Sequence, residues 1–303
     1  MATLKGQNFR ILIYNSSAEE YQVVGMATNC TVSLNSNQEQ AGTKDDVGLA
    51  AKPTIVSKNW QVQVDSLSVA DVSAMLTAIK NFTKFKLVWD ETSTNDNQIP
   101  ELDTTFARSG DALLTDATFQ FDDRTNSTKS LQFTGIGGIS ILTDDIPAGN
   151  VSTSGYTKGQ FIRLFLGTTA NPSKVIAAAK QLSLHVSVSL EDATTKDTEG
   201  DWKIQEPTEL NYDISTTALV RSGDTITSAV AGNDLESFQQ YFETGGTYAW
   251  QIANVSGANQ RTKGSVICSG NCLVTSLQIS AQNRSNATYQ VALTGYGAYT
   301  VGS

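Results

Sequence analysis

Apolar and polar residues alternate along much of this chain, which is typical of β-strands with one buried and one solvated face. The clearest case is residues 181–190, QLSLHVSVSL, where every even position is apolar and every odd position is polar. Thr28 to Leu34 repeats this pattern in the first half, with Cys30, Val32 and Leu34 facing inward. Further strands are predicted at 9–14, 60–64, 85–89, 114–121 and 130–135, and at 161–167, 210–215, 247–252, 266–280 (as a hairpin) and 288–295.

One segment in each half departs from the alternation and predicts an amphipathic α-helix. The first covers residues 69–80, with Ser68 as a candidate N-cap, and the second covers residues 233–242. Their apolar stripes are Val72, Met75, Leu76 and Ile79 in the first, and Leu235, Phe238, Tyr241 and Phe242 in the second. Each half is therefore expected to be a mainly β module with one helix packed against its sheet.

The two halves also repeat short sequences in the same order. KGQNFRIL at 5–12 returns as KGQFIRLF at 158–165, and FTGIG at 133–137 returns as LTGYG at 293–297. A repeat this long indicates a duplicated domain, and 303 residues suit two domains of roughly 150 residues each. We predict modules at 1–145 and 146–303, joined near residues 144–156.

Two polar stretches without periodicity are expected to be long loops, at residues 35–59 and 191–209. Both contain a Thr-Lys-Asp sequence, at 43–45 and at 195–197. Long loops in compact domains usually have a function or are disordered. Their shared sequence favours a function, although a solvated mobile loop fits the same composition.

The composition indicates an acidic globular protein. With 39% hydrophobic and 17% charged residues the chain is expected to fold, and no apolar run approaches the ~20 residues that span a bilayer. The opening residues lack the apolar core of a secretory signal, so assembly in a cytoplasm is expected. A net charge of −9 disfavours sequence-specific nucleic-acid binding. It would suit a channel that repels DNA from its wall, or simple solubility.

The sequence offers little support for catalysis. Nucleophilic catalysis needs a base, and the single histidine, His185, projects from the polar face of a strand, where a surface imidazole is the better interpretation. Cys268 and Cys272 could meet across a hairpin, so a disulfide between them stays open, but their spacing matches no metal site. We therefore expect no enzymatic activity, no cofactor and no metal.

Together these features resemble the major tail (tail tube) proteins of long-tailed bacteriophages, in a tandem-duplicated form. The resemblance rests on the opening Lys-Gly-x-x-Phe-Arg strand, residues 27–34 followed by 43–46, the strand WQVQVD at 60–65, the helix, and the closing FTG at 133–135. It covers nearly the whole chain. It implies β-sandwich or barrel-like modules, each with a flanking helix, that form rings and stack into a DNA-conducting tube.

The resemblance implies several properties of this chain. Members with one module form hexamers, so a duplicated chain is expected to form a trimeric, pseudo-hexameric ring. Expected partners are other copies of itself, a tape-measure protein and tail terminator or tip proteins, with transient passage of DNA, no membrane, and a place in the virion tail. Candidate ring-stacking residues are Thr43, Lys44, Asp45, Asp46, Thr195, Lys196 and Asp197; candidate lumen-facing residues are Gln61, Gln63, Asp65, Asn211, Asp213 and Ser215.

Two alternatives remain open from the sequence. The inner tube of a contractile injection system would have the same features. A carbohydrate-binding or capsid-decoration protein ranks lower, because such a protein would cluster exposed aromatic residues. Here Trp60, Trp89, Trp202 and Trp250 are scattered along the chain.

Overall fold

The structure is a computed structural model of the full chain. It describes residues 9–15, 20–24, 27–40, 42, 52–67, 72–91, 107–142, 157–198, 200–220, 233–256 and 262–302. The predicted module boundary at 145 and 146, the candidate N-cap Ser68, and the candidate stacking residues 43–46 lie outside the described residues. They stay predictions.

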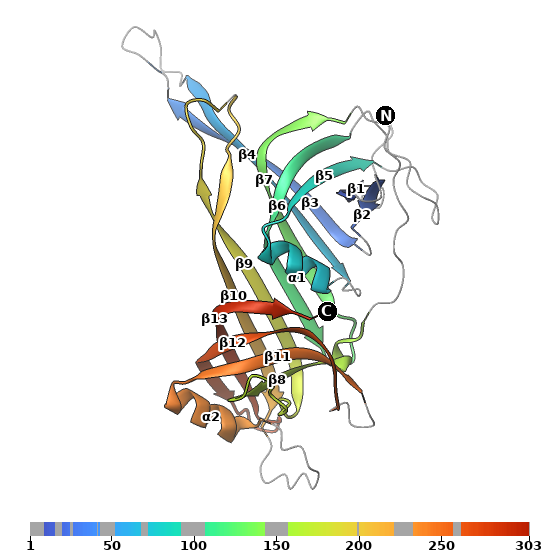
Figure 1. The fold of residues 1–303 in the computed structure, drawn as a ribbon, viewed down its shortest axis with the longest axis vertical. Helices are drawn as coiled ribbons and strands as arrows, with labels where there is room; N and C mark the ends of the chain where they lie inside the picture. The colour runs from blue at the N-terminus through green and yellow to red at the C-terminus, as the bar shows by residue number, and fades with distance from the viewer. Residues whose placement is uncertain are drawn as a thin grey trace.

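The described chain is mainly β, with one α-helix in each half, as the sequence predicts (Figure 1). The first half contains β1 (Phe9–Asn15), β2 (Glu20–Val23), β3 (Ala27–Gln40), β4 (Pro53–Leu67), α1 (Val72–Lys80), β5 (Lys84–Glu91), β6 (Arg108–Asp122) and β7 (Thr128–Ile141). The second half contains the 3₁₀ turn η2 (Gly159–Phe161), β8 (Ile162–Gly167), β9 (Ala179–Asp192), β10 (Gln205–Leu219), α2 (Leu235–Thr244), β11 (Thr247–Ser256), β12 (Thr262–Ser280) and β13 (Thr288–Val301).

Both halves pair their strands in the same order. In the first half the order is β1-β5-β6-β7-β4-β3, and in the second it is β8-β11-β12-β13-β10-β9, with all pairs antiparallel. In the first half Leu113 of β6 pairs with Thr134 of β7, and in the second half Leu273 of β12 pairs with Thr294 of β13. The two pairs differ by the same number of positions in both strands, so β6 and β7 correspond to β12 and β13 at one constant offset in sequence number. We call residues at matching register positions equivalent.

An aromatic side chain packed over glycines forms the centre of each half. In the first half the Trp60 indole lies over Gly110 and Gly135, donates a hydrogen bond of 3.0 Å to the Gly137 carbonyl, and contacts Trp89. The equivalent of Trp60 in the second half is a tyrosine. Two glycines on neighbouring strands leave the space that each ring fills.

In the second half the ring is that of Tyr212. It lies over Gly270 and Gly295, contacts Trp250, and its hydroxyl donates 2.6 Å to the Asn271 carbonyl. Both halves therefore use the same packing arrangement with a different aromatic residue, and one hydrophobic core cluster runs through both of them.

Both predicted long loops begin and end in strand, which corrects the bounds that the sequence suggests for them. β3 continues to Gln40 and β4 begins at Pro53; β9 continues to Asp192 and β10 begins at Gln205. In the first half these extensions project beyond the core and are exposed on both faces over most of their length, as Figure 1 shows for the blue hairpin. A strand without a buried face carries no alternation of apolar and polar residues, so periodicity misses it.

The segment predicted as a hairpin at 266–280 lies within the single strand β12. The Ser-Gly-Asn sequence that resembles a turn lies mid-strand, where Gly270 makes room for Tyr212 and Trp250. Cys268 and Cys272 are therefore four residues apart on one extended strand, roughly 13 Å, beyond disulfide reach. Both thiols are free and buried, and burial raises the pKa of Cys272 to about 12, so its reactive thiolate form is disfavoured at neutral pH.

Both helices form where they are predicted. In α1 the residues Val72, Leu76 and Ile79 are buried. Asp234 caps α2 by accepting a hydrogen bond from the Ser237 amide. Phe242, expected on the buried stripe of α2, is exposed instead. Leu34, which the alternation predicts to face inward, is exposed as well, because it lies where β3 leaves the core. Neither described helix is long and apolar enough to cross a membrane.

The packing of aromatic rings over glycine predicts that added methyl groups destabilise both halves. A Cβ at Gly135 would lie 2.1 Å from the Trp60 ring, and a Cβ at Gly295 would lie 2.6 Å from the Tyr212 ring. Gly135→Ala and Gly295→Ala should each lower the free energy of unfolding by about 1–3 kcal/mol, the usual cost of overpacking. Denaturant titration measures this. Gly246→Ala is the control, because its nearest neighbour lies at an ordinary 3.4 Å.

Candidate functional site

The two halves join through a shared β-sheet, and this junction is the candidate functional site. β6 pairs first with β5, up to Leu113, and then with β9 of the second half, from Asp116 to Asp122. One sheet therefore continues from the first half into the second (Figure 1). The junction uses the edge strand of the second half, β9, and the free lower part of β6.

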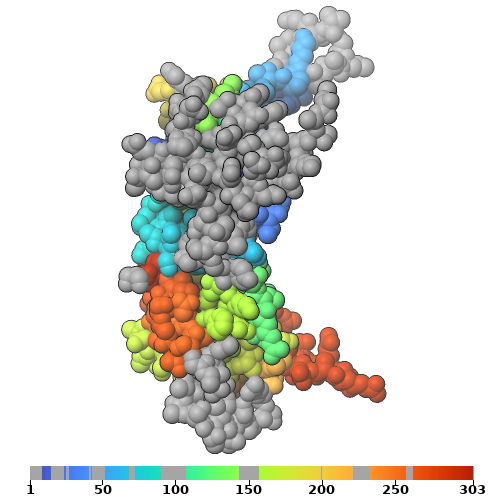
Figure 2. All heavy atoms as spheres, turned by 90° about the vertical axis from the view of Figure 1, so that its right-hand side faces the viewer, coloured from blue at the N-terminus to red at the C-terminus, as the bar shows by residue number. Residues whose placement is uncertain are grey.

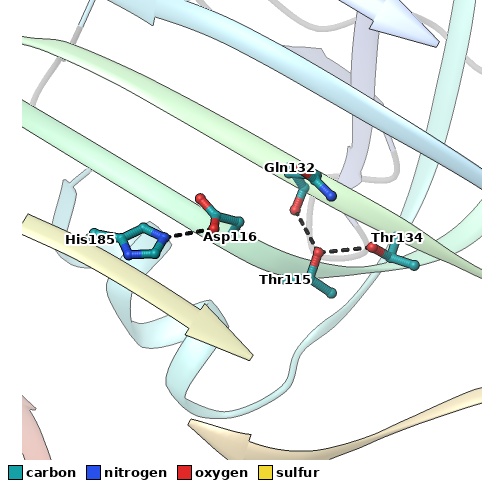
Figure 3. A network of polar contacts seen from close by, with 5 residues as sticks. All are labelled: Thr115, Asp116, Gln132, Thr134 and His185. Carbon is teal, nitrogen blue, oxygen red and sulfur yellow. Dashed lines mark hydrogen bonds and ion pairs between the residues drawn. The ribbon is translucent and has the colours of Figure 1, made fainter. Parts of the chain in front are cut away.

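A β-bulge at Thr115 lies where β6 changes partner. Its hydroxyl lies 2.8 Å from the Thr134 hydroxyl and donates 3.2 Å to the Gln132 carbonyl (Figure 3). The equivalent Thr275 of β12 makes the same contacts, to Thr294 and to the Ala292 carbonyl, at an equivalent bulge. Bulges bend and twist a strand, which gives β6 a direction suited to a second neighbour.

The buried face of the junction is an apolar seam. Ala117 lies opposite Val186, and Phe119 lies opposite Leu184. All four are at most 2% exposed. A shift of one residue would turn them toward solvent, so burial fixes the register of this junction.

The opposite, polar face carries a side-chain hydrogen bond across the junction. His185 Nε2 of β9 lies 2.7 Å from a carboxylate oxygen of Asp116 on β6 (Figure 3). Both side chains remain more than a third exposed. The sequence indicates a surface histidine but not its partner, because Asp116 lies on a strand of the other half.

Helix α1 extends the junction beyond the strands. It contacts β6 of its own half and β9, β12 and β13 of the other half. The Tyr299 hydroxyl of β13 donates a buried 2.7 Å hydrogen bond to the Leu76 carbonyl, and the Lys80 ammonium lies 5.9 Å from the Tyr299 ring centre. One helix thus covers the point where the halves meet (Figure 1).

The loop between β9 and β10 contacts the first half laterally. Asp201 forms a 3.1 Å ion pair with Lys58, the Lys203 amide donates to the Lys58 carbonyl, and Trp202 lies against Gly138. Sequence reasoning did not single out these residues, although a tryptophan within a polar loop is a signal for a contact. The candidate stacking residues 195–197 lie in the same loop, where the Asp197 amide donates to the Thr195 hydroxyl; stacking itself stays a prediction.

The candidate lumen-facing residues lie together on the polar face of the sheet. Gln61, Gln63 and Asp65 pair with Thr134, Gln132 and Ser130, and Asp213 lies between His185 and Thr294. The central positions of this face are Gln61, Gln63, Asp65, Asp116, Thr118, Gln120, Ser130, Gln132, Ser183, His185, Ser187, Asn211, Asp213, Ser215, Ser276 and Gln278. None of these positions is a lysine or an arginine. The face is polar with a few acidic groups.

The described residues contain no group of three His, Cys, Asp or Glu side chains that could hold a metal ion. The arrangement at the junction provides backbone pairing, an apolar seam and polar contacts. These are the components of a protein–protein interface.

The sequence model of the phage tail tube protein family matches residues 157–301. The second half of this chain is therefore similar in sequence to phage tail tube proteins. The match covers η2 and β8 through β13, the half whose strand order is repeated by β1 through β7. Curated protein sequences gave no match.

Solved structures that are similar to about half of the chain include the following three. The tail of an empty gene transfer agent particle, described with C6 symmetry, aligns with a TM-score of 0.39 and 18% identity over 48% of this chain and 99% of that one. The virion of the native gene transfer agent aligns with a TM-score of 0.36 and 17% identity over 48% of this chain and 99% of that one. The SPP1 tail tube aligns with a TM-score of 0.36 and 13% identity over 48% of this chain and 78% of that one.

The hydrogen bonds around Asp65 generate a pH-dependent prediction. Ser130 donates 2.6 Å to the Asp65 carboxylate, Asn29 and Gln63 donate as well, and these bonds hold the pKa of Asp65 below its ordinary 3.8. A carboxylate whose pKa is lower in the folded than in the unfolded state stabilises the fold above about pH 4. This stabilisation is lost as the pH falls through the pKa that the group has in the folded state. Ser130→Ala should therefore raise the pKa of Asp65 and weaken the loss of stability below pH 4.

Carboxyl NMR titration of Asp65, with unfolding midpoints at neutral and acidic pH, measures both effects. Ser183→Ala removes a hydroxyl from the same face that is not a donor to Asp65, so it should leave the titration unchanged. An unaltered Asp65 titration in Ser130→Ala would contradict the assignment.

Proposed function

We propose that this chain is the structural subunit of a tail tube, part of the virion of a phage or gene transfer agent, and that it assembles from copies of itself. The observation that carries the proposal is the junction of β6 with β9. It joins two modules of the same strand order, one of which matches the sequence model of the tail tube family. A chain that already contains one such junction can repeat it between copies.

Three chains would place six modules around one axis. The trimeric, pseudo-hexameric ring follows from the duplication, since closed rings built from repeated head-to-tail contacts place equivalent modules at equivalent positions. Rings stacked on one another would then form the tube, with the loop between β9 and β10 available for contacts between or along rings.

The polar face of the sheet is proposed to line the lumen. This face carries neutral and acidic side chains, which would not attract the phosphate backbone of DNA. They include Gln61, Gln63, Asn211 and Ser215, with acidic Asp65 and Asp213. DNA could then pass without binding to the wall. The proposal involves no catalysis, and the tape-measure, terminator and tip proteins are its expected further partners.

The inner tube of a contractile injection system is the second candidate. The same subunit would serve it, and neighbouring genes for a sheath and spike would distinguish the two. Carbohydrate binding is less well supported, because Trp60 and Trp250 are buried in the cores of the two halves.

Electron microscopy and mass measurement of the purified protein test the proposal. We expect rings or tubes with a central hole and a ring mass of three times 32.4 kDa. A chain that stays monomeric at every concentration and never forms rings would refute it. A closed dimer or tetramer would leave self-assembly standing and refute the trimer.

A further inference from the structure

We propose that β3 of one copy pairs antiparallel with the end of β12 of the next, in the register that β9 and β6 use within the chain. The inference rests on the proposed self-assembly and specifies its interface. Among the described strands, β3 pairs only with β4, and residues 276–280 of β12 pair only with β13. β3 is equivalent to β9, and β12 is equivalent to β6. The two edges that lack a second neighbour are therefore the counterparts of the two edges that pair with each other within the chain.

The register follows from these equivalences. Trp60 and Tyr212 are equivalent, so their partners Leu34 and Val186 are equivalent as well. On the other strand, Ala117 is equivalent to Leu277. The pair Ala117↔Val186 therefore becomes Leu277↔Leu34 between copies, with Ile279 opposite Val32, Ser276 opposite Asn35, and Ser280 opposite Thr31.

Exposed apolar residues occupy these two edges. Leu34 is 57% exposed and Ile279 is 49% exposed, whereas their equivalents in the internal junction, Val186 and Phe119, are 1% and 0% exposed. An open edge with exposed apolar side chains invites strand pairing. Figure 2 shows a red segment, by its colour the end of β12 and the start of β13, projecting from the lower half.

The second helix gives independent support. α1 and α2 are each followed by a left-handed residue, Phe82 with φ 51° and Gly245 with φ 64°, which makes Ile79 and Phe242 equivalent. Ile79, on the helix that covers the internal junction, is 0% exposed, whereas Phe242 is 51% exposed. The same docking would place α2 against β6 and β7 of the next copy.

That docking gives Phe242 an apolar partner. Tyr299, which contacts α1 within the chain, is equivalent to Ile139, and Val301 is equivalent to Ile141. Ile139 is only partly buried and Ile141 is among the most exposed apolar residues of the chain. A second copy therefore covers exposed apolar side chains on strand edges and helix alike.

Cysteine pairs test the register in assembled protein. Cys30 is first changed to alanine, because it directly precedes position 31 and is only partly buried. Cys268 and Cys272 are kept, because both thiols are buried. Thr31→Cys with Ser280→Cys, and Asn35→Cys with Ser276→Cys, each place two thiols directly opposite one another, where Cα atoms of antiparallel strands lie about 4.5–5.5 Å apart, within disulfide range. Thr31→Cys with Ser276→Cys is the matched control, four residues out of register, with cysteines at the same sites.

Mild oxidation and non-reducing electrophoresis give the result. Both in-register pairs should move the 32.4 kDa band to covalent dimers and trimers, and the control should not. Cross-linking of the control as fast as the in-register pairs would overturn the register. Rings without cross-links in either in-register pair would overturn this interface while leaving the tail tube proposal intact; absence of rings from the unmodified chain would refute both.

If a double variant fails to fold, mixtures of the single variants present the same pairs between copies.

Ile279→Asp gives a second measurement, because the Ile279 side chain is exposed in the single chain. It should leave the unfolding midpoint nearly unchanged and abolish ring formation. Persistent rings in this variant would contradict the proposed seam.

Discussion

The pairing of β6 with β9 is the interaction on which the arrangement of the molecule depends. A strand edge presents unpaired amide and carbonyl groups, and this contact satisfies them between two modules instead of within one. Because Ala117, Phe119, Leu184 and Val186 all point into the core, only one register buries them together. The hydrogen-bonded backbone joins the modules, and the apolar seam fixes how they are aligned.

The repeated packing of aromatic rings over glycine shows which features the two modules keep. Trp60 and Tyr212 differ in size and in their polar group, yet each lies over two glycines and donates a hydrogen bond to a backbone carbonyl. The threonine bulges in β6 and β12 are kept as well. These features shape the sheet, whereas residues on the polar face differ freely, because solvent-facing positions of a strand place few demands on packing.

Sequence patterns predict those elements that have one buried face. Residues 181–190 alternate because β9 has the core on one side and solvent on the other. The extensions of β3 and β4 have no such contrast, and the mid-strand Gly270 resembles a turn although it serves the packing of Tyr212. The partner of His185 lies on a strand of the other module, so no local pattern could indicate Asp116. The duplication is visible in sequence, but the strands that join the modules are not.

The differences between the internal and the proposed external junction explain what fusion of two modules achieves. β3 and β9 are equivalent strands, so either could compete for β6 or for β12. Covalent linkage gives β9 a higher effective concentration near β6 than a strand of another copy has, and the hydrogen bond between His185 and Asp116 favours this pairing. Ser33 and Ser276 stand at the matching external positions, and their short side chains lack the imidazole and the carboxylate, so the external contact depends mainly on backbone pairing and apolar burial. Fusion therefore lets one junction form with each folded chain, while the other forms only when copies meet.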